Sequence, residues 1–297
     1  MTRILHLSDP HVPATGPDMD GVDAIGSLER ILHDVRHVPD LDLIVVSGDI
    51  ADDGSAAGCE AVRERVGAFA AERGIPHVYS TGNHDDRDAF AAALGTGHLG
   101  AGGADRGTLL DPDGGTRAAV SDLGGLRVVT LDSLVPGQGH GVIGERQLAA
   151  LATVLASSAP RGTVLAFHHP PLRIPAIPYA ERAVLQDIDA LADVVRGTDV
   201  RVILTGHLHL QASGFLAGVP VWVTPGIVTR IDTSAAPGIV RGVLGASASV
   251  VDLSGDSSGD SSGDGPTFHV IHARDPRAGE EVYAYDALTG QDVTEPA

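Results

Sequence analysis

Up to about Gly214, short apolar runs alternate with longer stretches in which apolar residues recur at helical spacing. The helical pattern is clear in Glu181–Val195, where apolar residues recur every three or four positions from Val184 onward. The short runs predict strands at Arg3–Leu7, Leu41–Val46, His77–Tyr79, Leu126–Leu131, Thr163–Phe167 and Val200–Leu204, and the longer stretches predict helices at Ile25–Val38, Ala61–Arg73, Glu145–Ser157 and Glu181–Val195. Strands that alternate with helices are typical of a layered α/β fold.

The pattern changes after Gly214, where the remaining apolar segments read as strands joined by turns. These segments are Gly214–Val223, Gly245–Leu253, Thr267–Ala273 and Glu280–Asp286. We expect them to form a second, mainly antiparallel sheet inside one domain that spans residues 1–297. The tract Ser254–Gly265 (SGDSSGDSSGDG) has no apolar residue to bury, so we expect a flexible loop whose shortening changes stability little.

Composition narrows the classes of protein that the chain can belong to. Of the 297 residues, 43% are hydrophobic, and no apolar run is long enough to span a bilayer. The N-terminal MTRILHLSDPH lacks the long apolar core of a secretory signal, and the single cysteine, Cys59, fits a reducing compartment, so we expect a cytoplasmic protein without an intramolecular disulfide. A formal charge of −19 disfavours binding to nucleic acid backbones, and with it a nuclease.

Residues suited to metal binding follow five of the predicted strands. In chain order the motifs are Asp9-Pro10-His11, Gly48-Asp49, Gly82-Asn83-His84-Asp85, His168-His169-Pro170 and Gly206-His207-Leu208-His209. Ligands of open α/β sheets bind beyond the carboxyl ends of the strands, so the five motifs would converge there if the strands are parallel. In an extended segment, residues i and i+2 point to the same side, which would aim His207 and His209 at one point.

Each motif alone also has a structural explanation. Asp9 or Asp49 could form a helix cap or a turn, Asn83 could occupy a left-handed turn, and His168 or His169 could fill the core. Five such motifs at five strand ends are better explained by one shared site. Carboxylate, amide and imidazole ligands together suit Mn, Fe or Zn, whereas an all-oxygen set would suit Mg or Ca.

The ordered motifs resemble those of the calcineurin-like metallophosphoesterases, and most closely those of the bacterial class III cyclic-nucleotide phosphodiesterases. The stretches GNHDDR, FHHPP and RGTDVRVILTGHLH carry the likeness, which extends from Met1 to about Gln211. The resemblance implies a four-layer α/β/β/α sandwich with a dinuclear metal centre at the edge of the sheets, and a homodimer as one possible assembly. The tract Ser254–Gly265 has no counterpart in the motif set.

The resemblance also assigns roles to individual residues. It implies one ion held by Asp9, His11, Asp49 and His209 and a second held by Asp49, Asn83, His168 and His207, with Asp49 as the bridge. Spacing alone leaves His168 and His169 open as ligands, and the His-x-Pro spacing of the family selects His168. The residues implied in substrate contact are His11, Asp49, Asn83, His84 and His209. Asp85 is a candidate for orienting His84.

These roles predict a metal-dependent phosphodiesterase for a small substrate, with hydrolysis of 3′,5′-cAMP to AMP as the leading hypothesis. A hydroxide that bridges the two ions would attack phosphorus in line with the leaving oxygen. His84 would donate a hydrogen bond to the phosphoryl group or a proton to the leaving alkoxide. Two alternatives remain, namely another small diester, such as a glycerophosphodiester, and a non-catalytic interaction protein on the same scaffold. The second would be expected to have lost ligands.

Overall fold

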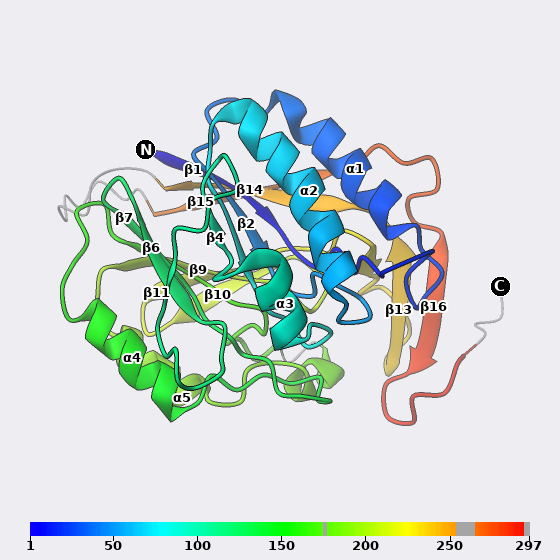
Figure 1. The fold of residues 1–297 in the computed structure, drawn as a ribbon. Helices are drawn as coiled ribbons and strands as arrows, with labels where there is room; N and C mark the ends of the chain where they lie inside the picture. Colours follow the sequence, from blue (N-terminus) through cyan, green and yellow to red (C-terminus); the bar gives the residue numbers. More distant parts are fainter. Residues whose placement is uncertain (175–176, 254–264, 294–297) are drawn as a thin grey trace.

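The computed structural model describes residues 1–174, 177–253 and 265–293. Two large β-sheets lie face to face, and helices cover the outer face of each sheet (Figure 1). Most of the tract expected as a flexible loop, residues 254–264, lies outside the described residues. No helix among the described residues combines the length and the apolar character that crossing a membrane requires.

The first sheet has the strand order β15-β14-β1-β2-β3-β4. Its strands are β1 (Thr2–Leu7), β2 (Leu43–Ser47), β3 (His77–Ser80), β4 (His98–Leu99), β14 (Ser247–Leu253) and β15 (Thr267–His272). β1, β2 and β3 are parallel, whereas β14 runs antiparallel to β1. The helical segments between these strands are α1 (Ala24–Asp34), η1 (Val35–His37), α2 (Ala56–Arg73) and α3 (Arg87–Leu94).

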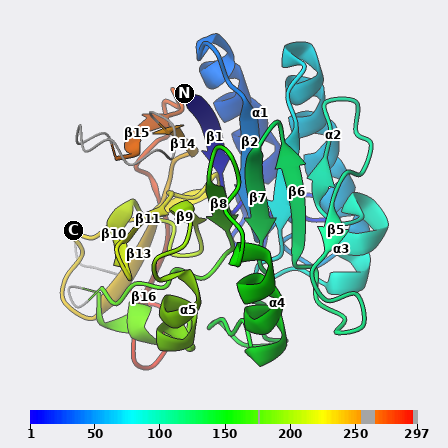
Figure 2. The same ribbon diagram turned by 90° about the vertical axis from the view of Figure 1, so that its left-hand side faces the viewer.

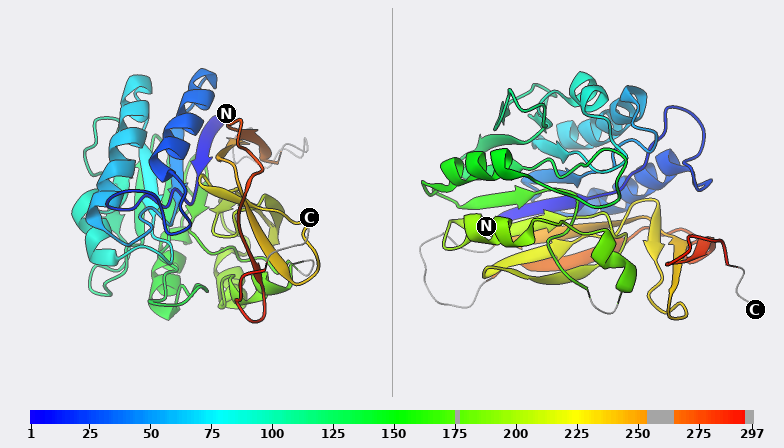
Figure 3. Two further views of the ribbon diagram at one scale, coloured as in Figure 1. Left: turned by 90° about the vertical axis from the view of Figure 1, so that its right-hand side faces the viewer. Right: turned by 90° about the horizontal axis from the view of Figure 1, so that it is seen from below.

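The second sheet has the order β10-β11-β9-β8-β7-β6-β5. Its strands are β5 (Thr108–Leu109), β6 (Ala119–Leu123), β7 (Leu126–Thr130), β8 (Thr163–Ala166), β9 (Val200–Thr205), β10 (Ala212–Leu216) and β11 (Val219–Val223), with α4 (Glu145–Leu155), η2 (Pro178–Arg182) and α5 (Ile188–Val195) between them. A third, small sheet consists of β12 (Thr229–Ile231), β13 (Ile239–Leu244) and β16 (Glu281–Asp286) and lies near the C-terminus (Figure 3).

Alternate residues of the central strands pack into different hydrophobic clusters, and this alternation creates the layers. In β2, Ile44 packs on the side of α1 and α2, whereas Val45 faces the second sheet. In β9, Ile203 packs on the side of α4 and α5, whereas Val202 joins the cluster between the sheets. Figure 2 shows the two helical layers on opposite sides of the paired sheets. The expected four-layer α/β/β/α sandwich is therefore confirmed.

The prediction of a separate antiparallel sheet after Gly214 is wrong. β14 and β15 extend the first sheet beside β1, and β10 and β11 extend the second sheet beside β9. Among the described late strands, β12, β13 and β16 form a separate three-stranded sheet. The late strands thus cover open edges of the two central sheets, where unpaired N–H and C=O groups would otherwise remain. The alternation of side chains along a strand predicts which face of the sheet each residue lies on, but it does not identify the strand that pairs with it.

The helix predicted at Glu181–Val195 is wrong in its first half, because α5 begins at Ile188. The chain before α5 is bound instead to the loop around Gly144. The Asp187 carboxylate accepts hydrogen bonds from the backbone N–H of Ile143 at 3.1 Å and of Gly144 at 2.8 Å. The sequence patterns also miss α3 and β6, which are too short for their periodicity to be distinctive.

Candidate metal centre

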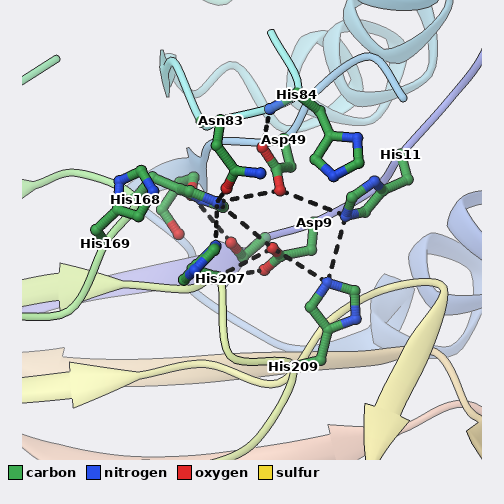
Figure 4. A network of polar contacts seen from close by, with 12 residues as sticks. Asp9, His11, Asp49, Asn83, His84, His168, His169, His207 and His209 are labelled. Atoms are coloured by element: carbon green, nitrogen blue, oxygen red, sulfur yellow. Dashed lines mark hydrogen bonds and ion pairs between the residues drawn. The ribbon is translucent and has the colours of Figure 1, made fainter. Parts of the chain in front are cut away.

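The loops that follow β1, β2, β3, β8 and β9 meet at one edge of the two sheets (Figure 4). Backbone hydrogen bonds fix these loops to one another. The N–H of Asp9 donates to the carbonyl of Gly48 at 3.2 Å, that of His11 to the carbonyl of Asp49 at 3.0 Å, and that of Gly206 to the carbonyl of His168 at 3.0 Å. The structure thus brings together the nine residues predicted from the strand ends, which are Asp9, His11, Asp49, Asn83, His84, His168, His169, His207 and His209.

Five of these residues have a left-handed backbone conformation, with positive φ at Asp9, His11, Asp49, His207 and His209. The expectation that His207 and His209 lie in an extended segment is therefore wrong. Both rings still reach the centre, because the backbone turns at each of them (Figure 4). Positive φ is uncommon for residues other than glycine and tends to cluster at functional sites. Five positive φ angles in one cluster of loops therefore mark this region as a candidate functional site.

Two motif glycines make this arrangement possible. A Cβ at Gly48, where φ is +90°, would overlap the ring of His168. A Cβ at Gly82 would overlap the carboxylate of Asp49. The glycines beside Asp49 and Asn83 are thus needed because site side chains occupy the volume that a Cβ would take.

Asp49 is the central acid of the cluster. Its Oδ2 lies 3.1 Å from Nε2 of His168 and 3.5 Å from Nε2 of His11. Oδ1 of Asn83 also lies 3.2 Å from Nε2 of His168, and Nδ1 of His207 lies 3.1 Å from the same nitrogen. Asp49 therefore stands between a group formed by Asn83, His168 and His207 and a second group that contains His11.

Asp9 and His209 complete this second group. Nε2 of His209 lies 3.3 Å from Oδ1 of Asp9 and 3.3 Å from Nε2 of His11. Asp9 and Asp49 are almost fully buried, so both carboxylates need compensating positive charge. The two groups correspond to the two ligand sets implied by the family resemblance.

Three of the imidazoles have the outer ring nitrogen bound to an oxygen, which leaves the inner nitrogen facing the cluster. Nδ1 of His168 lies 2.7 Å from the carbonyl oxygen of Ser47, Nδ1 of His209 lies 2.8 Å from Oγ1 of Thr229, and Nδ1 of His11 lies 3.0 Å from Oδ1 of Asp52. The Ser47 carbonyl can only accept, so Nδ1 of His168 donates to it and Nε2 is the nitrogen that faces the cluster, where a bound cation would take the place of a proton. Histidines that bind metals are usually oriented by such contacts.

Sequence reasoning missed Asp52, which supports both His11 and His84. Besides its contact with His11, its backbone carbonyl accepts a hydrogen bond from Nδ1 of His84 at 2.9 Å. Asp85, the candidate partner for His84, binds elsewhere and accepts hydrogen bonds from the backbone N–H groups of Ile50, Ala51 and Gly82. Asp85 therefore joins the loops after β2 and β3, and the proposed Asp85–His84 contact is wrong. No sequence motif pointed to Asp52, which lies three residues after Asp49 in an acidic turn.

The neighbouring His168 and His169 point to different partners. Nε2 of His168 faces Asp49 and Asn83, whereas Nδ1 of His169 lies 2.8 Å from Oγ of Ser133. The ring of His169 still lies against that of His207, with centroids 4.5 Å apart. The choice of His168 as the ligand stays a prediction of the His-x-Pro spacing, because nitrogens of His168, His169 and His207 also lie close enough together to share an ion.

The protonation of the cluster reflects its need for positive charge. Burial favours neutral His168, but the attraction of Asp49 and Asp9 outweighs it and raises the pKa of His168 to about 9. Burial would raise the pKa of Asp49, but the facing imidazoles of His168 and His11 hold it well below its usual range. Burial together with His168 lowers the pKa of His207 to about 3. The carboxylates thus draw a proton onto His168, whereas His207 stays neutral.

The donor set fits metal ions. Carboxylate and imidazole atoms approach one another closely enough to share an ion in several triads, among them Asp9–His11–His209 and Asp9–Asp49–His168. Inner nitrogens of neighbouring rings, such as Nε2 of His11 and of His209, face each other without an intervening acceptor. Cations between such atoms would satisfy the buried carboxylates and the inward lone pairs together.

Comparison with known proteins agrees with this geometry. A sequence profile of the calcineurin-like phosphoesterase family matches residues 2–211. A Rhodococcus erythropolis protein named "probable cyclic nucleotide phosphodiesterase" is 40% identical, over 82% of this chain and 76% of its own length. A Mycobacterium tuberculosis protein named "cAMP/cGMP dual specificity phosphodiesterase" is 39% identical, over 82% of this chain and 73% of its own length.

The fold and the clustered ligands define a candidate two-metal phosphoesterase site. The chain belongs to the calcineurin-like phosphoesterase family, as its resemblance predicted. Among solved structures, a purple acid phosphatase from yellow lupin is similar, with a TM-score of 0.54 and 12% sequence identity. This likeness covers 98% of this chain and 52% of that chain, and it shows a shared fold.

Proposed function

We propose that the protein is a dinuclear metal-dependent phosphodiesterase that hydrolyses 3′,5′-cyclic nucleotides, including cAMP to AMP. The observation that carries this proposal is the position of Asp49, whose Oδ2 lies between Nε2 of His11 and Nε2 of His168. A carboxylate between two groups of inward-facing ligands is what a pair of ions 3.5–4 Å apart requires. The two bacterial relatives named as cyclic nucleotide phosphodiesterases support the choice of substrate.

The proposed ligands follow from the two groups of the cluster. Asp9, His11 and His209 would hold one ion, Asn83, His168 and His207 would hold the other, and Asp49 would serve both. This set of oxygen and nitrogen donors suits Fe, Mn or Zn. Two bound cations would lower the pKa of an attacking water and offset negative charge on the phosphoryl oxygens. They would also allow an acidic chain to bind an anionic substrate, because bound cations dominate the local field.

His84 is the proposed catalytic residue outside the ligand set. Its backbone N–H donates to Oδ1 of Asp49 at 2.9 Å, which holds the residue at the rim of the centre. Its Nδ1 donates to the carbonyl of Asp52, so Nε2 is the ring atom that can contact substrate. The side chain is 25% exposed, which leaves it accessible to a bound diester. From there Nε2 can donate a hydrogen bond to the phosphoryl group or a proton to the leaving oxygen.

The substrate contacts, the cellular location and the assembly of the protein also remain proposals. Substrate would contact His11, Asp49, Asn83, His84 and His209, which line the same edge of the sheets. A cytoplasmic location is supported by the only cysteine, Cys59, which is a free, buried thiol. A homodimer stays a prediction of the family resemblance.

A substrate panel with purified, metal-loaded protein tests the function. The panel comprises 3′,5′-cAMP, 3′,5′-cGMP, glycerophosphocholine and bis(p-nitrophenyl) phosphate. We expect the cyclic nucleotides to have the highest kcat/KM among the natural diesters. Preference for glycerophosphocholine would replace the proposed substrate class, and the absence of all four activities in protein with both ions bound would favour a non-catalytic role.

A further inference from the structure

A cavity of about 220 Å³, here called the His209 pocket, adjoins the proposed metal centre. His209 forms the shared wall, since it lines the pocket while its Nε2 faces Asp9 and His11. The pocket is smaller than the usual cavity for a whole small-molecule ligand, so it suits one part of a ligand that extends from the centre. Its surface is more polar than apolar, with Leu210, Pro225 and Ile231 as the apolar part and Gln211, Arg230, Thr233 and His272 as the polar part.

Arg230 is the polar group of the pocket that most clearly lacks a partner. Its guanidinium makes no hydrogen bond or ion pair with any described residue, and its Nε is buried without a partner among them. The nearby Asp232 does not neutralise it, because that carboxylate pairs with Arg241 at 2.9 Å. In a chain with a net charge of −19, such an arginine beside the centre points to a ligand that accepts hydrogen bonds.

The surroundings of Arg230 position it along the pocket. Gly245 leaves space for it, since a Cβ there would lie 2.5 Å from Nε of Arg230. His272 is the last residue of β15 in the first sheet, and its Nδ1 is 2.9 Å from Oγ of Ser247. Burial, and then the charge of Arg230, lower the pKa of His272, so its ring is neutral at neutral pH. The pocket therefore combines one positive fork with neutral polar groups and an apolar part.

This combination matches a purine base better than a second phosphate. A base is a flat, largely apolar ring with donors and acceptors on its edges, whereas a phosphate would gain nothing from Leu210, Pro225 and Ile231. Arginine forms paired hydrogen bonds with O6 and N7 of guanine, and glutamine forms them with N6 and N7 of adenine. Arg230 and Gln211 are thus suited to the two purines respectively.

We propose that the His209 pocket binds the purine base of the nucleotide and that Arg230 is the residue that recognises guanine within it. This inference rests on the proposed function for its substrate class, and it adds the residues that discriminate the base. Such a pocket would accept both purine cyclic nucleotides. The ribose would then pass over His209, between the base and the phosphorus at the metal centre.

Competition against a substrate without a base tests the pocket independently of cyclic-nucleotide hydrolysis. The assay measures hydrolysis of bis(p-nitrophenyl) phosphate, with GMP, AMP and ribose 5-phosphate added as inhibitors. The ratio of the inhibition constant of ribose 5-phosphate to that of GMP measures what the base adds to binding. In the wild type we expect both GMP and AMP to bind more tightly than ribose 5-phosphate.

Arg230→Met should lower the base contribution for GMP by roughly 5-fold or more, the lower end of what a paired base contact discriminates. It should lower the contribution for AMP less. Gly245→Ala keeps the charge but displaces the guanidinium, and it should have the same direction of effect. The matched control is Arg274→Met, which removes a positive charge two residues from His272. Arg274 does not line the pocket and pairs with Asp34 instead. This control should leave both ratios unchanged.

Two results would overturn the inference. One is a wild type that binds ribose 5-phosphate as tightly as GMP and AMP. The other is an Arg230→Met variant that weakens all three inhibitors equally while its metal content stays normal, which would place Arg230 at the phosphate. A wild type that shows the base contribution but hydrolyses no cyclic nucleotide would contradict the proposed function and leave the pocket assignment standing.

Discussion

Oδ1 of Asp52 lies 3.0 Å from Nδ1 of His11, on the side of the imidazole ring away from His209. The same carboxylate accepts a hydrogen bond from the backbone N–H of Met19 at 2.7 Å through its other oxygen. Asp52 is therefore held in place from one side and orients the proposed ligand His11 from the other. In the proposed metal centre, Asp52 would therefore support metal binding through His11, although it is not one of the proposed ligands.

Replacing Asp52 should weaken metal binding without unfolding the protein. Residues that orient metal-binding histidines typically contribute about 10–100-fold in affinity, so we expect a loss of this size for Asp52→Ala and a smaller one for Asp52→Asn, which keeps an acceptor. Chelator competition measures the affinity directly. Asp53→Asn is the control, because Asp53 accepts hydrogen bonds from Ala14 and Ser55, which lie outside the cluster. Equal affinities in Asp52→Ala and wild type would contradict the role.

Asp49→Ala should remove more than one ligand contact. Its Oδ2 serves both groups of the cluster and its Oδ1 accepts from the N–H of His84. We expect loss of both ions under dialysis and loss of turnover, measured by elemental analysis and by diester hydrolysis. A variant that retains two ions per chain and most of its turnover would rule out a bridging role for Asp49.

His84→Ala should separate catalysis from metal binding. His84 contacts Asp52 through its ring and Asp49 only through its backbone, so the variant should retain both ions and its fold. Turnover should fall by roughly 10²–10⁴-fold, the usual effect of removing a positioned acid or base. The loss should be smaller for substrates with good leaving groups if His84 protonates the leaving oxygen. An equal loss across leaving groups would instead indicate stabilisation of the phosphoryl oxygens, and loss of an ion would contradict the division of roles.

His98 should make folding stability depend on pH in the acidic range. The ring is buried between Oγ of Ser121 and Oγ1 of Thr130, and this burial lowers its pKa to about 4. An unfolded histidine has a pKa of about 6.5, so the unfolded chain binds more protons between these values. The contribution is complete above about pH 6.5 and is lost as the pH falls toward 4.

Urea unfolding of the wild type and His98→Gln at several pH values measures this contribution. Removing one titrating group should make the pH dependence shallower by up to about 1.4 kcal/mol per pH unit in this range. The variant is expected to be less stable than the wild type near pH 8, where His98 is neutral in both states. Parallel pH profiles for the two proteins would show that His98 does not titrate differently on unfolding.

The sequence predicted the residues of the site well because two independent signals coincide at the strand ends, namely the end of an apolar run and a motif of Asp, Asn or His residues. Apolar runs located β1, β2, β3, β8 and β9, and the motif residues follow each run directly. The conformations of these loops were not predictable, since positive φ at Asp9 or His207 depends on contacts with other loops. Asp52 was missed for the same reason, because its partner His11 is distant in sequence and only the fold brings them together.

The late strands show a similar limit. The apolar segment Gly245–Leu253 predicted β14 as a strand, but its place beside β1 depends on a pairing between segments that are far apart in the sequence. Ile4 and Val251 are register partners across β1 and β14, and both belong to the hydrophobic cluster between the two sheets. Long-range pairing of this kind leaves no local pattern in the sequence.

Stepwise addition of metal to chelated protein, followed by hydrolysis of 3′,5′-cAMP, tests the central claim most directly. We expect no hydrolysis without metal, a rise as metal is added, and a plateau near two ions per chain, as a dinuclear centre built around Asp49 requires. Hydrolysis of cAMP by the metal-free protein would contradict the metal centre. A protein that binds two ions and cleaves bis(p-nitrophenyl) phosphate but neither cAMP nor cGMP would contradict the proposed substrate.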